Sequence, residues 1–225
     1  GGQTGCQRRL CQQFGERGLV RGHIWCFDVF GQPGCWQDAA CLYGIQNLIV
    51  AAEGNLSVRL GGHAFLVTPS GVGKGDLRVQ DLLEIDAAGR CPRGRPSSEW
   101  PLHRRIYENR PDIGAICHAH PPWATAFAAA GRDLDGSLLT ETAAILGKVP
   151  VCSRAEPGTE AAADSVLPHI RTHDAVLLGS HGAVTVGRDL PAAFALLETV
   201  ERLAQVTLLA SLARGEGGSL PPGLR

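Results

Sequence analysis

The chain has 225 residues, of which 44% are hydrophobic and 19% charged, so it can bury the core of one large globular domain. Its formal net charge of −1, from 21 basic and 22 acidic residues, excludes the global field expected of a nucleic-acid-binding or membrane-surface protein. No apolar run approaches the length of a membrane span, and the first residues lack the core of a signal peptide, so we expect a cytoplasmic protein.

Eight cysteines invite a disulfide interpretation, but their placement argues against it. A chain of this length does not need covalent staples, and Cys117 and Cys152 lie within apolar, strand-like runs. The absence of any CxxC pair also makes a cysteine-based zinc module improbable. We therefore expect buried or free thiols.

The first quarter of the chain has little regular pattern. Gln7–Leu19 has apolar residues at near-helical spacing and predicts an amphipathic packing helix interrupted by Gly15. Gly22–Glu53 has poor periodicity, although Ile45–Ala52 is compatible with a strand or a short helix. Three interpretations of this stretch stay open: an inserted loop that covers a neighbouring surface, an oligomer contact, or an artefact of the sequence.

Regular patterning begins at Gly54. Alternation over Asn55–Leu60 and Ala64–Thr68, on either side of a Gly-Gly turn, predicts a β-hairpin. A turn with several backbone donors follows at 68–71. Asp76–Asp81 is then expected to form a helical turn and Leu82–Asp86 a strand.

The centre of the chain predicts a helix, a strand and a second helix. Ser97–Asn109 has an apolar side and ends before Pro111, with Ser97 or Ser98 as the expected N-cap and Glu99 in the first turn. Beyond the strand Ile113–His118, Pro121-Pro122 predicts the start of a helix that runs to about Ala130.

The last third alternates short strands with helices, and only Leu138–Gly147 is ambiguous. The predicted elements are a strand at Val149–Ser153, a helix at Thr159–Ile170, strands at Ala175–Leu178 and Ala183–Val186, and a helix at Leu190–Ala213. We expect a three-layer α/β/α fold with a mixed, mostly antiparallel central sheet. It would form a single domain over 1–214, with an atypical insertion at 23–53 and a flexible tail at 215–225.

Three histidines and a glutamate stand out as candidate metal ligands. His118 and His120 are two residues apart in a strand-like run, so period-two geometry directs both imidazoles to one face. Glu99 starts the preceding helix, and His181 lies in the loop between two predicted strands. Three imidazoles and one carboxylate can bind a divalent ion such as zinc.

Six motifs carry a resemblance to a known family. GNLSVRL, TPSGVGK, PSSEWPLH, RPDIGAICHAHP, EPGTE and AVLLGSHGAVTVG occur in the order seen in class II sugar-phosphate aldolases. The chain resembles the class II aldolase and adducin superfamily, in particular its L-fuculose-phosphate aldolases, weakly over Gln7–Gly22 and strongly over Gly54–Ala210. The resemblance implies the AraD-like fold of that superfamily.

The resemblance also implies a metal site and a reaction. The family's ligands fall on His118, His120, His181 and Glu99, with Zn²⁺ as the expected ion and Mn²⁺ or Co²⁺ as alternatives. The implied activity is that of an aldolase that cleaves or forms a C–C bond in a sugar phosphate, the metal stabilising an enediolate of dihydroxyacetone phosphate. Glu99 would move a proton at the same carbon.

A phosphate-binding site is implied beside the metal. By matched motif it uses Asn55, Ser70, Gly71, Ser97 and Ser98. Serine hydroxyls, turn amides and a helix N-terminus together suit an anion. The simpler alternative is that the two serines of PSSE only cap a helix and that Gly71 only makes a turn.

The chain departs from the family pattern in two places. A small phosphate-contacting residue normally precedes the GN motif; here either Ala52-Glu53 stands in for it or the phosphate pocket is compromised. The tyrosine expected to protonate the product is replaced by Leu139. Glu141 is therefore the candidate second acid or base, with a surface or capping role as its competitor.

These departures keep several functions open. Within the superfamily, ribulose-phosphate 4-epimerase, phosphotetronate decarboxylase and methylthioribulose-phosphate dehydratase activities use nearly the same ligands. A non-catalytic adducin-like assembly domain is a further alternative, against which the retention of all four ligands argues. By resemblance we also expect a homotetramer, with a small sugar phosphate and no nucleic acid or membrane as partner.

Overall fold

A computed structural model of the chain describes residues 48–50, 52–61, 63–74, 77 and 79–215. The helix expected at Gln7–Leu19, most of the stretch at 22–53 and nearly all of the tail lie outside these residues. Within them, no helix combines the length and the apolar character needed to cross a bilayer.

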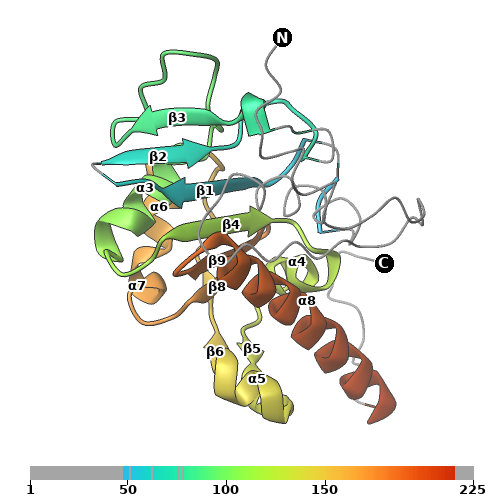
Figure 1. Cartoon of the computed structure of the whole chain (residues 1–225). Helices are drawn as coiled ribbons and strands as arrows, with labels where there is room; N and C mark the ends of the chain where they lie inside the picture. The colour runs from blue at the N-terminus through green and yellow to red at the C-terminus, as the bar shows by residue number, and fades with distance from the viewer. Residues whose placement is uncertain (1–47, 51, 62, 75–76, 78, 216–225) are drawn as a thin grey trace, which may run out of the picture.

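A seven-stranded sheet forms the middle layer, in the order β3-β2-β1-β4-β9-β8-β7 (Figure 1). Every pairing is antiparallel except that of β7 with β8, which confirms the mixed, mostly antiparallel sheet. The strands are β1 (Asn55–Arg59), β2 (Ala64–Val67), β3 (Leu83–Asp86), β4 (Ala115–Ala119), β7 (Val151–Cys152), β8 (Ala175–Leu178) and β9 (Gly182–Gly187). The predicted hairpin is present as β1 and β2.

Helices cover both faces of the sheet and give it two cores. Helices α4 (Pro122–Ala129) and α8 (Leu190–Ala213) pack on the face that receives Ala115 and Cys117 of β4. Helices α3 (Trp100–Asn109), α6 (Glu160–Ser165) and α7 (Leu167–Ile170) cover the opposite face. This is the predicted three-layer arrangement (Figure 1).

Period-two geometry sorts the residues of the central strand between these cores. Cys117 belongs to the core under α4 and α8, whereas its neighbour Ile116 belongs to the core under α3. His118 has the parity of Ile116 and therefore faces the side of the sheet on which α3 lies. His120, two residues further on and directly after β4, continues the same alternation, so both imidazoles are directed to this side of the sheet.

The ambiguous stretch before the seventh strand contains a small separate unit. Strands β5 (Leu134–Asp135) and β6 (Lys148–Val149) pair outside the main sheet. The short helix η3 (Gly136–Leu138) and helix α5 (Thr140–Ile145) connect them. Figure 1 shows this yellow unit projecting below the main sheet, away from β1–β3.

Two predicted helices differ from the structure at their ends. Helix α3 begins at Trp100, so Glu99 occupies the N-cap position and neither Ser97 nor Ser98 does. The helix predicted over Thr159–Ile170 is divided at Val166 into α6 and α7. Pro168 explains the break, because it has no N–H to continue the helical ladder. The helical turn predicted at Asp76–Asp81 is confined to η2 (Val79–Asp81) within the described residues.

Candidate metal centre

The structure brings the three predicted histidines together. His118 is the fourth residue of β4, His120 follows the strand directly, and His181 lies in the turn between β8 and β9. One ring nitrogen from each histidine lies within 4.8 Å of the others, a spacing that can hold a metal ion. The pairing of β4 with β9 explains the convergence, since His118 stands opposite Val184 and Ala119 opposite Ala183.

Glycine makes the turn around His181 possible. A Cβ at Gly182 would lie 2.7 Å from Cδ2 of His120 and would also collide with the carbonyl of Ala119. The turn is closed by the amide of His181, which donates to the carbonyl of Leu178 at 2.9 Å. A larger residue after His181 would therefore separate the imidazoles that the strand pairing brings together.

Glu99 completes the cluster from the start of α3. Its Oε2 lies 2.9 Å from Nε2 of His118 and accepts a hydrogen bond of 2.7 Å from the amide of Asn55. Its Oε1 lies 3.7 Å from Nε2 of His181. Glu99 is only 8% exposed, so these partners replace the water that a carboxylate needs.

Hydrogen bonds on the outer side of two rings fix their tautomers. Nδ1 of His118 lies 2.9 Å from the carbonyl oxygen of Ala183, and Nδ1 of His120 lies 3.0 Å from Oε2 of Glu53. Both neighbours accept hydrogen bonds, so each Nδ1 carries a proton and each ring turns its Nε2 toward the cluster. Those two Nε2 atoms are 3.3 Å apart.

The inner atoms of the cluster therefore need a cation between them. Two imidazole lone pairs and an ionised carboxylate oxygen repel one another unless a proton or a metal ion lies among them. Nitrogen and oxygen donors of this kind are the ones that zinc and other first-row divalent ions prefer. The donor set fits the metal on which class II aldolases depend.

The pKa shifts of the cluster match this requirement. Burial raises the pKa of Glu99, but the neighbouring His118, His181 and Asn55 outweigh it and hold the pKa well below its usual range. Burial and the charge of His118 lower the pKa of His181 to about 4. Burial lowers the pKa of His118, but Glu99 and the carbonyl of Ala183 outweigh it and raise the pKa, so in the metal-free protein a proton on His118 takes the place of the cation beside Glu99. Glu99 is ionised and His181 neutral near neutral pH, the states in which both can bind a metal.

The predicted phosphate-contacting segments lie side by side next to the cluster. Pro69 pairs with Pro96 in an isolated bridge, and the amide of Ser70 donates to the carbonyl of Arg95 at 2.9 Å. Ser97 is also tied in, because its amide donates to Thr68 and its Oγ accepts from the amide of Glu99. Ser98 and Gly71 are exposed beside this bridge.

Two predicted site residues have other surroundings. The amide of Asn55 is engaged with Glu99, so this side chain supports the metal cluster whatever it does toward a substrate. Glu141 lies exposed on α5, in the small unit outside the main sheet, and is not part of the metal cluster. The catalytic role of Glu141 stays a prediction.

Sequence reasoning missed two residues that hold the edge of the site. Glu53 bonds His120, and the buried Lys74 donates from Nζ to the carbonyl oxygens of Ala52 and Val72 at 2.9 and 3.0 Å. Glu53 is expected from the sequence only as a stand-in before the GN motif, and Lys74 only as the last residue of the TPSGVGK motif, without a role of its own.

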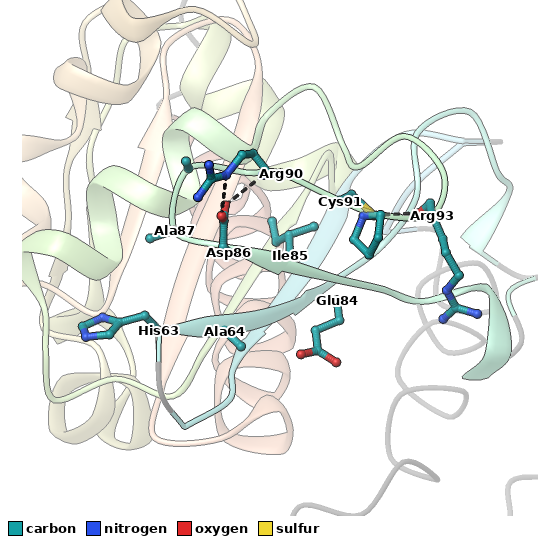
Figure 2. Close-up of a pocket in the computed structure, with 11 residues that line it drawn as sticks. His63, Ala64, Glu84, Ile85, Asp86, Ala87, Arg90, Cys91 and Arg93 are labelled. Atoms are coloured by element: carbon teal, nitrogen blue, oxygen red, sulfur yellow. Dashed lines mark hydrogen bonds and ion pairs between the residues drawn. The ribbon is translucent and has the colours of Figure 1, made fainter.

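A separate cavity of about 700 Å³ lies at the β3 edge of the sheet. Figure 2 shows its lining, where Arg90 forms a 2.7 Å ion pair with Asp86 and Glu84 points away from that pair. None of the four predicted ligands lines this cavity. It is therefore not part of the candidate metal centre.

Comparisons with known proteins agree with this geometry. The family described as Class II Aldolase and Adducin N-terminal domain matches residues 38–208. A 5-methylthioribulose-1-phosphate/5-deoxyribulose-1-phosphate aldolase from Rhodospirillum rubrum is 38% identical over 170 residues, which span 75% of this chain and 76% of the relative. An L-fuculose phosphate aldolase from Methanococcus maripaludis is 33% identical over 162 residues, spanning 72% of this chain and 87% of that protein.

Solved structures have the same fold. The crystal structure of L-fuculose-1-phosphate aldolase from Thermus thermophilus superposes with a TM-score of 0.75 and 36% sequence identity. The match covers 83% of this chain and 97% of the Thermus chain. The similarity therefore extends over nearly the whole of that enzyme.

Proposed function

The chain belongs to the class II aldolase and adducin family, and from that premise we propose that it is a metal-dependent lyase acting on a sugar phosphate. The observation that carries the proposal is the convergence of Glu99, His118, His120 and His181, with one carboxylate and three imidazole nitrogens directed inward. We infer that these four side chains hold one divalent ion, with Zn²⁺ as the first choice and Mn²⁺ or Co²⁺ as alternatives.

When bound, the ion supplies Lewis-acid stabilisation of the negative charge that develops on substrate oxygens as a C–C bond breaks. Glu99 supplies the proton transfer. Its two oxygens are not equivalent, because Oε2 is held by Asn55 and His118 while Oε1 lies 3.7 Å from Nε2 of His181. We assign to Oε1 the proton that moves at the reacting carbon.

The sugar phosphate is proposed to place its phosphate at the bridge between the two serine-containing segments. Ser70 and Gly71 follow one side of that bridge, and Ser97 and Ser98 follow the other, directly before the N-terminal end of α3. Hydroxyls, amides and a helix N-terminus bind anions without a basic side chain. Asn55 spans the two parts, since its amide contacts Glu99 at the end of this segment.

A ketose 1-phosphate is the proposed substrate class. The relatives named above support it, because their names specify aldolases of ribulose 1-phosphate derivatives and of fuculose phosphate. Glu141 is the proposed second acid or base. Since it does not join the cluster of its own chain, it would have to reach the site from a neighbouring copy in the homotetramer expected from the resemblance.

One experiment tests the proposal. The purified protein is loaded separately with zinc, manganese and cobalt and incubated with a panel of ketose 1-phosphates, while dihydroxyacetone phosphate is measured with a coupled enzyme assay. We expect metal-dependent release of dihydroxyacetone phosphate. Epimerised, decarboxylated or dehydrated products would instead assign another reaction of the superfamily. Failure to bind any divalent ion, together with no metal-dependent turnover, would contradict the enzyme proposal.

A further inference from the structure

A short turn before β1 lies directly against β4, which contains His118 and is followed directly by His120. The amide of Glu53 donates to the carbonyl of Val50 at 3.1 Å, and the carbonyl of Ala52 accepts from the buried Nζ of Lys74. Gly54 has a φ of 68°, and a Cβ there would lie 2.7 Å from the carbonyl oxygen of His118. Only glycine lets the chain come so close to β4 in this conformation.

The tight approach brings the carboxylate of Glu53 to the outer side of His120. Its Oε2 lies 3.0 Å from Nδ1, on the opposite side of the ring from the nitrogen that faces His118. The backbone of His120 is fixed as well, because its amide donates to the carbonyl of Leu48 at 3.0 Å. Backbone and ring of His120 are thus both held by the segment before β1.

His118 and His120 differ in the group that contacts their Nδ1 atoms. His118 is completely buried and its Nδ1 bonds a backbone carbonyl, whereas the partner of His120 is a charged carboxylate. A carboxylate behind a ligating imidazole fixes its tautomer and increases the electron density at the nitrogen that binds the metal. The side chain of Glu53 is 48% exposed, so water still contacts part of its carboxylate.

We propose that Glu53 is a positioning residue of the metal centre, which holds His120 with Nε2 toward the ion and strengthens that ligand. This inference rests on the proposed function, because it assumes that the cluster binds a divalent metal. It also separates position 53 from phosphate binding: an ionised carboxylate repels a phosphate, so Glu53 does not replace the small phosphate-contacting residue that the family carries before the GN motif.

Metal affinity tests the proposal without reference to turnover. The dissociation constant for Zn²⁺ is measured by competition with a chromophoric chelator for the wild type, Glu53→Ala, Glu53→Gln and Glu84→Ala. Glu84 is an exposed carboxylate on β3 that lines the separate cavity, and its variant is the matched control. We expect Glu53→Ala to bind zinc about 10- to 100-fold more weakly, the range typical of lost outer partners of metal-ligating histidines.

The glutamine variant separates orientation from charge. Its side-chain oxygen can still accept the proton of Nδ1, so Glu53→Gln should retain part of the affinity, while Glu84→Ala should match the wild type. The visible absorption spectrum of the Co²⁺-loaded proteins should change in Glu53→Ala, since the ligand field depends on the orientation of His120.

The outcomes distinguish this inference from the proposed function. If the wild type binds zinc and both Glu53 variants bind it within twofold of the wild type, with unchanged Co²⁺ spectra, Glu53 does not position His120. If the wild type itself fails to bind a divalent ion, the proposed function fails first. Circular dichroism of the metal-free proteins checks folding, and if Glu53→Ala does not fold, the affinity of Glu53→Gln decides.

Discussion

The carboxylate of Glu99 is buried and held in place by its neighbours. Burial alone would favour the protonated form of this carboxyl group. The contacts of one oxygen with Asn55 and His118 outweigh burial and favour the ionised form. A carboxylate kept ionised in this way can serve both as a ligand and as a proton acceptor. The two roles make different demands on charge and on shape.

Glu99→Gln separates these demands, because it keeps the shape of the side chain and removes the charge. We expect turnover to fall by about 10²- to 10⁴-fold, the usual contribution of a positioned acid or base. Zinc content, measured by atomic emission on the same samples, shows whether the loss arises from the metal or from the proton transfer. Wild-type turnover in a fully metal-loaded Glu99→Gln would show that Glu99 is not the base.

Lys74 provides a pH-dependent prediction. Burial lowers its pKa to about 8 in the folded protein, against 10.5 in an unfolded chain. Between these values the unfolded chain holds a proton that the folded protein has released, so stability rises with pH in that window. Below pH 8 both states are protonated, and the buried charge costs about 3 kcal/mol.

Urea denaturation of the wild type and Lys74→Met at pH 7, 8, 9 and 10 measures this contribution. The free energy of unfolding of the wild type, taken relative to the variant, should be flat below pH 8 and increase from pH 8 to pH 10. Other titrating groups affect both proteins and cancel in the difference. Parallel pH profiles for the two proteins would show that burial does not lower the pKa of Lys74.

At this scale the sequence predicts which side chains converge better than it predicts what holds them in place. His118 and His120 share a face because strands alternate, a property of any strand, and the structure has that arrangement. Glu53 lies in a stretch with no usable periodicity, 67 positions before the histidine that it contacts. Such a contact depends on how the turn at Gly54 approaches β4, which no local pattern encodes.

Among the elements, α4 is held by a residue far from it in the chain. The carboxylate of Glu201 in α8 accepts hydrogen bonds from the amides of Trp123 and Ala124, at 3.1 and 2.9 Å. Pro121 precedes the helix and cannot cap it with its side chain, so Glu201 takes that task. Glu201 is half-buried for this reason.

Removing this cap should weaken the element that follows the metal-binding strand. We expect Glu201→Ala to lower the free energy of unfolding by about 1–2 kcal/mol, as for other lost N-caps. Thermal and urea unfolding measure the change, and Glu198→Ala on the same helix is the matched control. Equal effects of both substitutions would mean that the two hydrogen bonds contribute nothing beyond helix propensity.

The start of α3 shows where rules for helix ends fail. Serines before an apolar run predict an N-cap, yet the hydroxyl of Ser97 accepts from the amide of Glu99, its carbonyl accepts from the amide of Trp100, and the helix begins at Trp100. The bridge between Pro69 and Pro96 accounts for this, because it keeps the serine segment extended beside the turn after β2. A long-range contact thus overrides a local preference. The long helix α8 matches its predicted bounds since its cap, Asp189, acts locally.

At the scale of the whole molecule, the fold class follows from the order of strand and helix patterns. The three layers and the mostly antiparallel sheet were predictable because strands such as β8 and β9 are short, apolar and separated by turns. The β5–β6 unit was not predictable. Its strands have two residues each, too few for any period to be recognised.

Metal binding should be visible in the stability of the whole protein. An ion that binds only the folded state adds about 2.7 kcal/mol when its free concentration is 100 times the dissociation constant, which corresponds to a rise in Tm of about 5–10 °C for a domain of this size. Differential scanning fluorimetry with zinc and with excess chelator measures it. In His181→Ala most of the rise should disappear, whereas His169→Ala, a histidine outside the cluster, should keep it. A zinc-dependent rise of equal size in His181→Ala would exclude this histidine as a ligand.

The pairing of β4 with β9 also sets an order of events during protein synthesis. The carbonyl that fixes the tautomer of His118 belongs to Ala183, 65 positions later in the chain. A nascent chain that has been synthesised as far as His118 and His120 still lacks this carbonyl and His181. The complete ligand set therefore cannot guide the early collapse of the chain, and metal capture becomes a late step that follows translation of β9.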